Sequence, residues 1–182
     1  VLVSLPHEGL VTGVEDLLDA LDSFLPRAAQ ALRRADEARS FKTMRPLVLR
    51  YAAMAGATDI VPLAGLATVP AAQGAMLNAL ARKHGVELTP ARMGMLASAL
   101  GVGSLVRMAA GLVIRQGVKL VPVAGQTLGA AAAAGTSFAT TYALGRAASA
   151  WFHGTARGEA PDGATLRTLY DQALRGARHA PD

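Results

Sequence analysis

The feature that most constrains this 182-residue chain is a 26-residue stretch without any charge, LVPVAGQTLGAAAAAGTSFATTYALG at 120–145. It holds eight alanines and four glycines. Read every fourth residue, it presents only small side chains: Gly125, Gly129, Ala133, Ser137, Thr141 and Gly145. Residues four apart lie on one face of a helix, and small side chains on that face let another backbone approach closely. The stretch therefore predicts a helix with a packing stripe that begins Gly125, Gly129, Ala133 and Ser137.

The same stretch is long enough to cross a bilayer, which needs about 20 residues. Its six strongly apolar residues favour insertion by only about 2 to 3.5 kcal/mol, and its glycines, threonines, serine and glutamine oppose it. The preceding segment carries Arg107, Arg115 and Lys119, each costing about 2.5–3.5 kcal/mol at the bilayer centre. These three cations share a helix face, and Trp151–Phe152 follow the uncharged stretch, so we predict that all five form a membrane or partner surface. A soluble or peripheral helical bundle is favoured, with integral insertion of 120–145 as the alternative.

The composition narrows the chemistry. With no cysteine, disulfides and thiolate metal sites are excluded, and the four histidines show no metal-ligand spacing, so no metal site is expected. Residues 1–26 carry five acids and no Lys or Arg, whereas 27–50 carry seven bases and two acids. Such a basic segment suits an anionic membrane or an acidic partner, or simply a solvated helix face. It is poor in aromatics, so nucleic acid is not expected as a partner.

The periodicity predicts an all-α fold, a compact helical bundle, with one short N-terminal β-strand left over at 1–6. Thr89–Pro90 reads as an N-cap and first helical residue, and Gly85 as a C-cap. The hexapeptides IVPLAG and LVPVAG, 60 residues apart, suggest turns at Pro62–Gly65 and Pro122–Gly125 in two related helical hairpins; chance recurrence in an Ala/Gly-rich chain is the alternative. The expected segments are 1–26 (strand and helix), 27–45 (basic connecting helix), 46–152 (helical domain), 153–163 (linker) and 164–182 (amphipathic helix and tail).

Sequence signatures of catalysis are missing. The chain has no phosphate-binding GxxxxGK[ST], HExxH or GxSxG motif, and no ordered Ser/His/Asp set. Asp59 is the one acid within a long apolar stretch, and we expect it to cap a helix or to pair with an arginine at a turn. No catalytic residue is assigned, and the chain is expected not to be an enzyme.

Several short motifs together resemble the YcjF-type family, a helical domain of unknown function. The matching residues are Pro62, Gln73–Met76–Leu77, Lys119–Pro122–Gly125, Thr141–Leu144–Gly145 and Trp151–Phe152. The resemblance covers about residues 45–155 and rests on the order and spacing of these pieces. Members are commonly membrane-associated, so the resemblance implies a cytoplasmic protein, peripheral at the inner membrane.

In that family the helical domain often follows an Era-like bacterial GTPase domain. VLVSLP at 1–6 looks like the last strand of such a domain, and 13–26 like its last helix. Ser4 would match the serine of the guanine-contacting S-A-K loop, although Leu5–Pro6 stand in place of Ala–Lys. The resemblance implies that GTP and Mg bind in an upstream G domain and that no cofactor binds in this chain.

These observations lead to one expected function and one alternative. The expected function is a non-catalytic module that couples the nucleotide state of an Era-like GTPase to a membrane surface or a protein partner. The alternative is a self-associating structural domain, a homo-oligomer without a membrane role, in which the small-residue stripe packs against a second copy.

Overall fold

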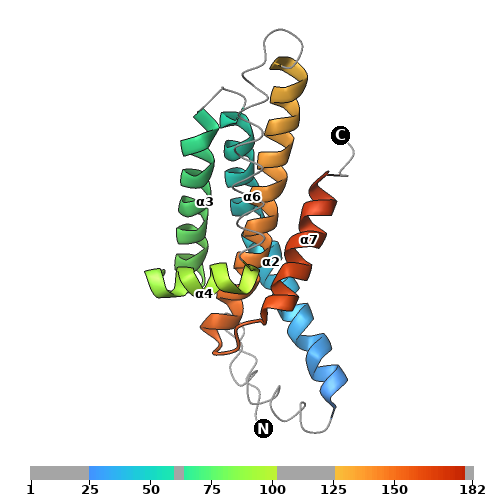
Figure 1. The fold of residues 1–182 in the computed structure, drawn as a ribbon. Helices are drawn as coiled ribbons and strands as arrows, with labels where there is room; N and C mark the ends of the chain where they lie inside the picture. Colours follow the sequence, from blue (N-terminus) through green and yellow to red (C-terminus); the bar gives the residue numbers. More distant parts are fainter. Residues whose placement is uncertain (1–24, 60–63, 102–125, 179–182) are drawn as a thin grey trace. The chain divides into compact units, whose positions relative to one another are not determined.

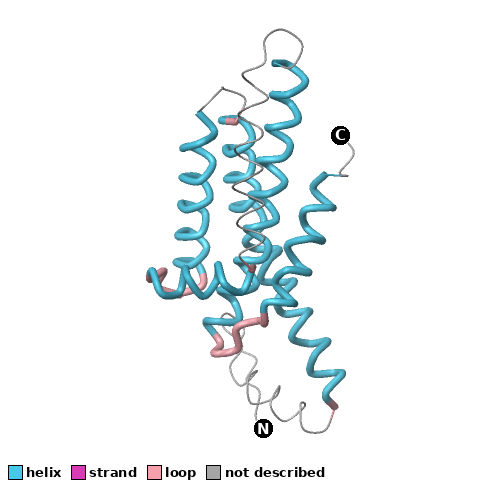
Figure 2. Tube along the Cα trace, in the orientation of Figure 1, coloured by secondary structure: helices cyan, strands magenta, loops and turns pink. Residues whose placement is uncertain are grey.

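The computed structural model describes residues 25–59, 64–101 and 126–178, and within these ranges it contains helices and no strand (Figures 1 and 2). The helices are α2 (Pro26–Thr58), α3 (Ala64–Lys83), α4 (Pro90–Leu100), α6 (Gln126–Ala156) and α7 (Gly163–Arg178). The prediction of an all-helical, compactly packed domain is therefore confirmed for these ranges. The N-terminal strand expected at 1–6 lies outside the described residues.

The helix ends follow standard capping chemistry. α3 closes with Gly85 at a φ of 69°, and the N–H of Val86 reaches back to the carbonyl of Ala81 at 2.9 Å. Thr89 caps α4 by accepting the N–H of Arg92 at 3.3 Å, and Pro90 is the first helical residue. The caps expected at Gly85 and at Thr89–Pro90 are thus confirmed.

Two interior prolines do not interrupt their helices. We expected one helix to end near Pro46 and another to begin after it, but α2 runs unbroken from Pro26 to Thr58. Likewise, α3 runs from Ala64 to Lys83 without a break at Pro70. A proline removes one helical hydrogen bond, and in α2 the packing of the fully buried Val48, Ala52 and Ala55 after the proline offsets that loss.

The chain divides into two compact units, residues 1–42 and 43–182, and the boundary falls inside α2. In the second unit α6 packs against α3 and α7, while α4 packs against α7. Figure 1 shows α3 and α6 running in the same direction, with α4 crosswise near the ends of both. α6 is thus the central helix of this unit, and most of its residues from Ser137 to Phe152 are buried.

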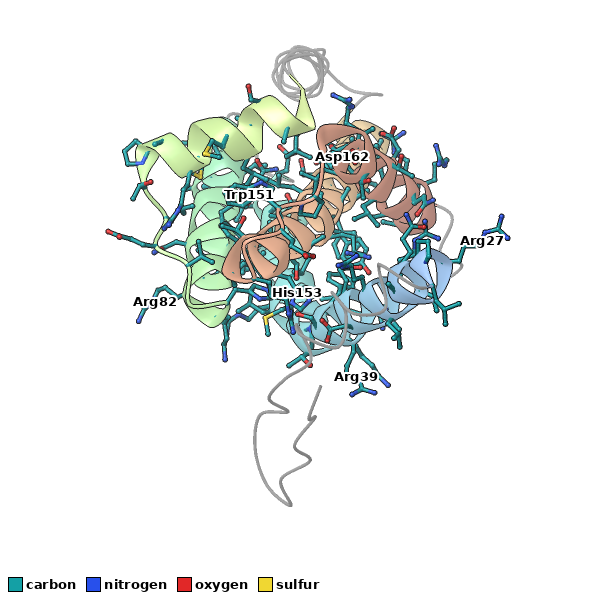
Figure 3. The ribbon with its side chains drawn as sticks, turned by 90° about the horizontal axis from the view of Figure 1, so that it is seen from below. Arg27, Arg39, Arg82, Trp151, His153 and Asp162 are labelled. Atoms are coloured by element: carbon teal, nitrogen blue, oxygen red, sulfur yellow. The ribbon has the colours of Figure 1, made fainter. Side chains whose placement is uncertain are left out.

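The connection between α6 and α7 is shorter than the expected linker at 153–163. α6 continues to Ala156, and the carbonyl of Gly154 accepts the N–H groups of Arg157 at 3.0 Å and Glu159 at 2.8 Å. A Cβ at Gly154 would lie 2.7 Å from Cδ of Pro161, so only glycine allows this tight reversal. Asp162 then caps α7, accepting the N–H of Thr165 at 2.7 Å (Figure 3).

Candidate functional site

One face of α6 forms the most distinctive feature of the second unit. The small-residue stripe predicted from the sequence continues along this face in steps of four residues, and each residue of this part is buried: Ser137, Thr141, Gly145 and Ser149. The three hydroxyl groups each contact a polar side chain from elsewhere in the chain. We call this row of paired polar groups and close contacts the α6 seam.

The first pair of the seam joins α6 to the end of α2. The Ser137 hydroxyl donates a 2.6 Å hydrogen bond to Oδ2 of Asp59, and neither residue is exposed. Asp59 directly follows α2, and its N–H still reaches the carbonyls of Ala55 and Gly56 at 3.2 Å. A carboxylate at a helix C-terminus faces the negative end of the helix dipole, and burial removes its water. The hydroxyl of Ser137 therefore compensates a group that is costly to place here.

The sequence led us to expect that Asp59 caps a helix or pairs with an arginine at a turn. In the structure it directly follows α2, whereas an acid that caps a helix lies at the start of one. Its side chain accepts a hydrogen bond from Ser137 of the α6 seam.

Gln73 of α3 makes the second pair. Its amide nitrogen donates to the hydroxyl of Thr141 at 3.1 Å, and Thr141 is fully buried. The resemblance quoted Gln73 and Thr141 as separate motif positions 68 residues apart in the sequence. In the structure they meet across the α3–α6 interface, where this part-buried polar pair favours one alignment of the turns of α3 against those of α6.

His84 makes the third pair, just after α3. Its Nε2 lies 3.4 Å from Oγ of Ser149, and its ring is 5.9 Å from that of His153 in an edge-on arrangement. Burial lowers the pKa of His84, and the charges of His153 and Arg157 lower it further. The described geometry therefore favours a neutral imidazole at the junction of α3 and α6.

Between the second and third pairs, Gly145 brings α6 close to both neighbouring helices. A Cβ there would lie 2.5 Å from Cγ1 of Val48 and 3.0 Å from Sδ of Met76. At the other end of the seam, a Cβ at Gly56 of α2 would lie 3.0 Å from the carbonyl oxygen of Ala134. The described part of the stripe is therefore occupied by α2 and α3 of the same chain.

The remaining predicted site residues fall into two groups. Trp151 (labelled in Figure 3) and Phe152 are 3% and 0% exposed, and their rings meet edge-on. The prediction that they form a membrane or partner surface is therefore wrong. They belong to α6, the helix that packs against both α3 and α7, and such large apolar side chains contribute more when buried. Gly65, expected in a turn, is the second residue of α3, and Ala133 is buried on α6.

Gly129 lies in the first turn of α6. The other predicted residues lie outside the part of the chain that the structure describes: Ser4, Pro62, Arg107, Arg115, Lys119, Pro122 and Gly125. Within the described ranges, no helix combines the length and apolarity that crossing a membrane requires. The same ranges hold no group of three or more acidic or histidine side chains placed to bind a metal ion.

Sequence reasoning found the stripe but not its partners. Gln73 lies on α3 and His84 just after its last residue, and each gains its role only from its position opposite Thr141 or Ser149 of α6. Comparisons with protein-family models, curated proteins and solved structures find no match for this chain.

Proposed function

We propose that this chain is a non-catalytic helical module that couples the nucleotide state of an upstream Era-like GTPase domain to an anionic membrane surface or a protein partner. The observation that carries the proposal is the continuity of α2 from the basic segment to the α6 seam. This single helix of 33 residues contains the basic segment and is directly followed by Asp59, which is bonded to Ser137 of α6. A shift of α2 would thus be felt at the α6 seam.

The charge of α2 supports the choice of an anionic partner. Exposed cations occur along its length: Arg27, Arg34, Arg39, Lys42, Arg45 and Arg50. At 100° per residue, Arg27, Arg34, Lys42 and Arg45 fall within about a quarter of the helix circumference. Basic residues on one helix face attract anionic lipid headgroups or an acidic protein surface, and the attraction weakens as salt is added.

Binding to an anionic membrane is tested by co-flotation of the chain with neutral and with anionic vesicles at low and high salt. A variant with Arg27, Arg34, Lys42 and Arg45 changed to Gln should lose binding to the anionic vesicles. A control with four other exposed cations changed to Gln (Arg82, Lys83, Arg175 and Arg178) removes the same charge and should keep most of the binding. Equal loss in both variants would contradict a specific α2 surface.

A test of the coupling between nucleotide state and partner binding needs the G domain. In a fusion to an Era-like G domain, partner binding should differ between the GTP-bound and GDP-bound states, and deletion of 27–50 should abolish the difference. Binding that is identical in the two nucleotide states would contradict the coupling role.

The self-association alternative depends on a free stripe. Since Ser137 and Gly145 already contact α2 and α3, a second copy would have to use positions nearer the start of α6. Replacement of Gly129 by Leu tests it, because a steric block there should break an oligomer that uses the stripe.

A further inference from the structure

Two observations coincide in the middle of α2. Pro46 lies inside the helix and is exposed, and it has no N–H to donate to the carbonyl of Lys42, four residues earlier. The boundary between the two compact units lies between Lys42 and Thr43. The turn that lacks a helical hydrogen bond is therefore the turn at which one packed unit gives way to the other.

The two halves of α2 also differ in burial. After the boundary, Val48, Ala52, Ala55, Gly56 and Asp59 are buried at helical spacing, so this half is held in the second unit. Before the boundary, from Pro26 to Lys42, Ala29 is the one buried position. Burial that repeats at helical spacing thus begins just past the proline.

We propose that residues 42–46 of α2 are a hinge, at which the helix bends without unfolding. Sharp bends in helices, above about 20°, occur almost always at proline or at a comparable break in the hydrogen bonding. Residue 31 is 13 residues from residue 44, or about 20 Å along the helix axis. A change of about 20° at the hinge therefore displaces residue 31 by about 7 Å.

Pro70 of α3 provides an internal control. It is also an exposed proline inside a helix, but α3 lies wholly within the second unit. A proline alone would bend both helices, whereas a hinge requires both a missing hydrogen bond and a change of packed unit. The hinge is thus expected in α2 and not in α3.

Pairwise spin-label distances test the hinge, and the natural absence of cysteine makes the labels specific. One pair, Ala31→Cys with Ala75→Cys, spans the hinge, and a second, Ala53→Cys with Ala75→Cys, lies within the second unit; all three positions are exposed. The spanning pair should give a distance distribution several ångströms wider than the internal pair. Pro46→Ala should narrow it, and Pro70→Ala should leave it unchanged.

Distributions of equal width for the two pairs, or a spanning distribution unaffected by Pro46→Ala, would overturn the hinge. Amide exchange of the unsubstituted chain gives a second readout that does not depend on the variants folding. Exchange should be faster at the amides of residues 42–45 than in the turn that contains Ala52, and uniform protection of the amides along 42–56 would likewise overturn the hinge. Any role of this hinge in coupling rests on the proposed function. Neither measurement needs nucleotide or membrane, so the hinge and the proposed function can fail separately.

Discussion

Replacement of Gly145 by Ala tests the close approach of α6 to its neighbours. In an exposed helix interior, Gly→Ala stabilises by about 1 kcal/mol. At Gly145, however, the new methyl would lie 2.5 Å from Cγ1 of Val48, about 1 Å inside an ordinary contact. Val48 is fully buried and β-branched, so it cannot move aside by rotating, and overpacking of this kind costs about 1–3 kcal/mol.

Gly74 of α3 is the matched control, because a Cβ there meets nothing within 4 Å. In urea unfolding, Gly74→Ala should raise the free energy of unfolding by about 1 kcal/mol. The Gly145→Ala variant should be less stable than the Gly74→Ala variant by about 1–3 kcal/mol. Val48→Ala removes both clashing methyl carbons at a cost of about 2 kcal/mol. In that background Gly145→Ala should become stabilising.

The cycle of Gly145→Ala and Val48→Ala therefore predicts a favourable coupling of about 1–3 kcal/mol. Two results would refute the reasoning. One is that Gly145→Ala stabilises as much as Gly74→Ala. The other is that the effects of the two substitutions add to within about 0.5 kcal/mol, as they do for residues that do not touch.

Three further predictions concern the polar contacts. Ser137→Ala should lower the free energy of unfolding by about 1–3 kcal/mol, because it removes a hydroxyl donor from the buried Asp59 carboxyl. The control Thr136→Ala, one residue away and outside the seam, should change that free energy by no more than about 0.5 kcal/mol, and equal effects of the two substitutions would contradict the prediction. The lowered pKa of His84 means that the unfolded chain binds its proton more tightly, so the stability due to this group is complete above pH 6.5 and is lost as the pH falls toward the lowered value. His84→Gln should then lose less stability than the unsubstituted chain between pH 7.5 and 5, and parallel pH profiles would speak against it. Hydrogen bonds from Thr165, chiefly from its backbone N–H, lower the pKa of Asp162, so its contribution is present above pH 3.8 and disappears as the pH falls toward the lowered value. Asp162→Ala should speed amide exchange in the first turn of α7 at neutral pH, with Asp162→Asn closer to the unsubstituted chain, and unchanged exchange in both would argue against the cap.

The local features of this fold could be read from the sequence. Thr89–Pro90 and Gly85 mark helix ends because capping depends on a few neighbouring residues. The spacing of Leu166 and Tyr170 placed an amphipathic helix at the C-terminus, and both residues are buried in α7. The small-residue stripe also predicted a close helix contact, which Gly145 makes with Val48.

What the sequence could not supply was the effect of tertiary packing. Pro46 looked like the boundary between two helices, because the packing that keeps α2 continuous involves residues distant in the sequence. Trp151 and Phe152 were predicted to form part of a surface because they follow an uncharged stretch, and only the position of α6 at the centre of the second unit places them in the core. The pairing of Ser137 with Asp59 joins residues 78 apart, which no local pattern indicates.

Amide hydrogen exchange of the chain with and without anionic vesicles tests the central claim most directly, because it reads α2 and α6 in one experiment. The account predicts that vesicles slow exchange in the basic part of α2 (27–45) and also change it along 133–149 of α6, and that Ser137→Ala removes the second effect while keeping the first. A change confined to 27–45, or the same response of α6 in Ser137→Ala, would contradict coupling between α2 and the α6 seam.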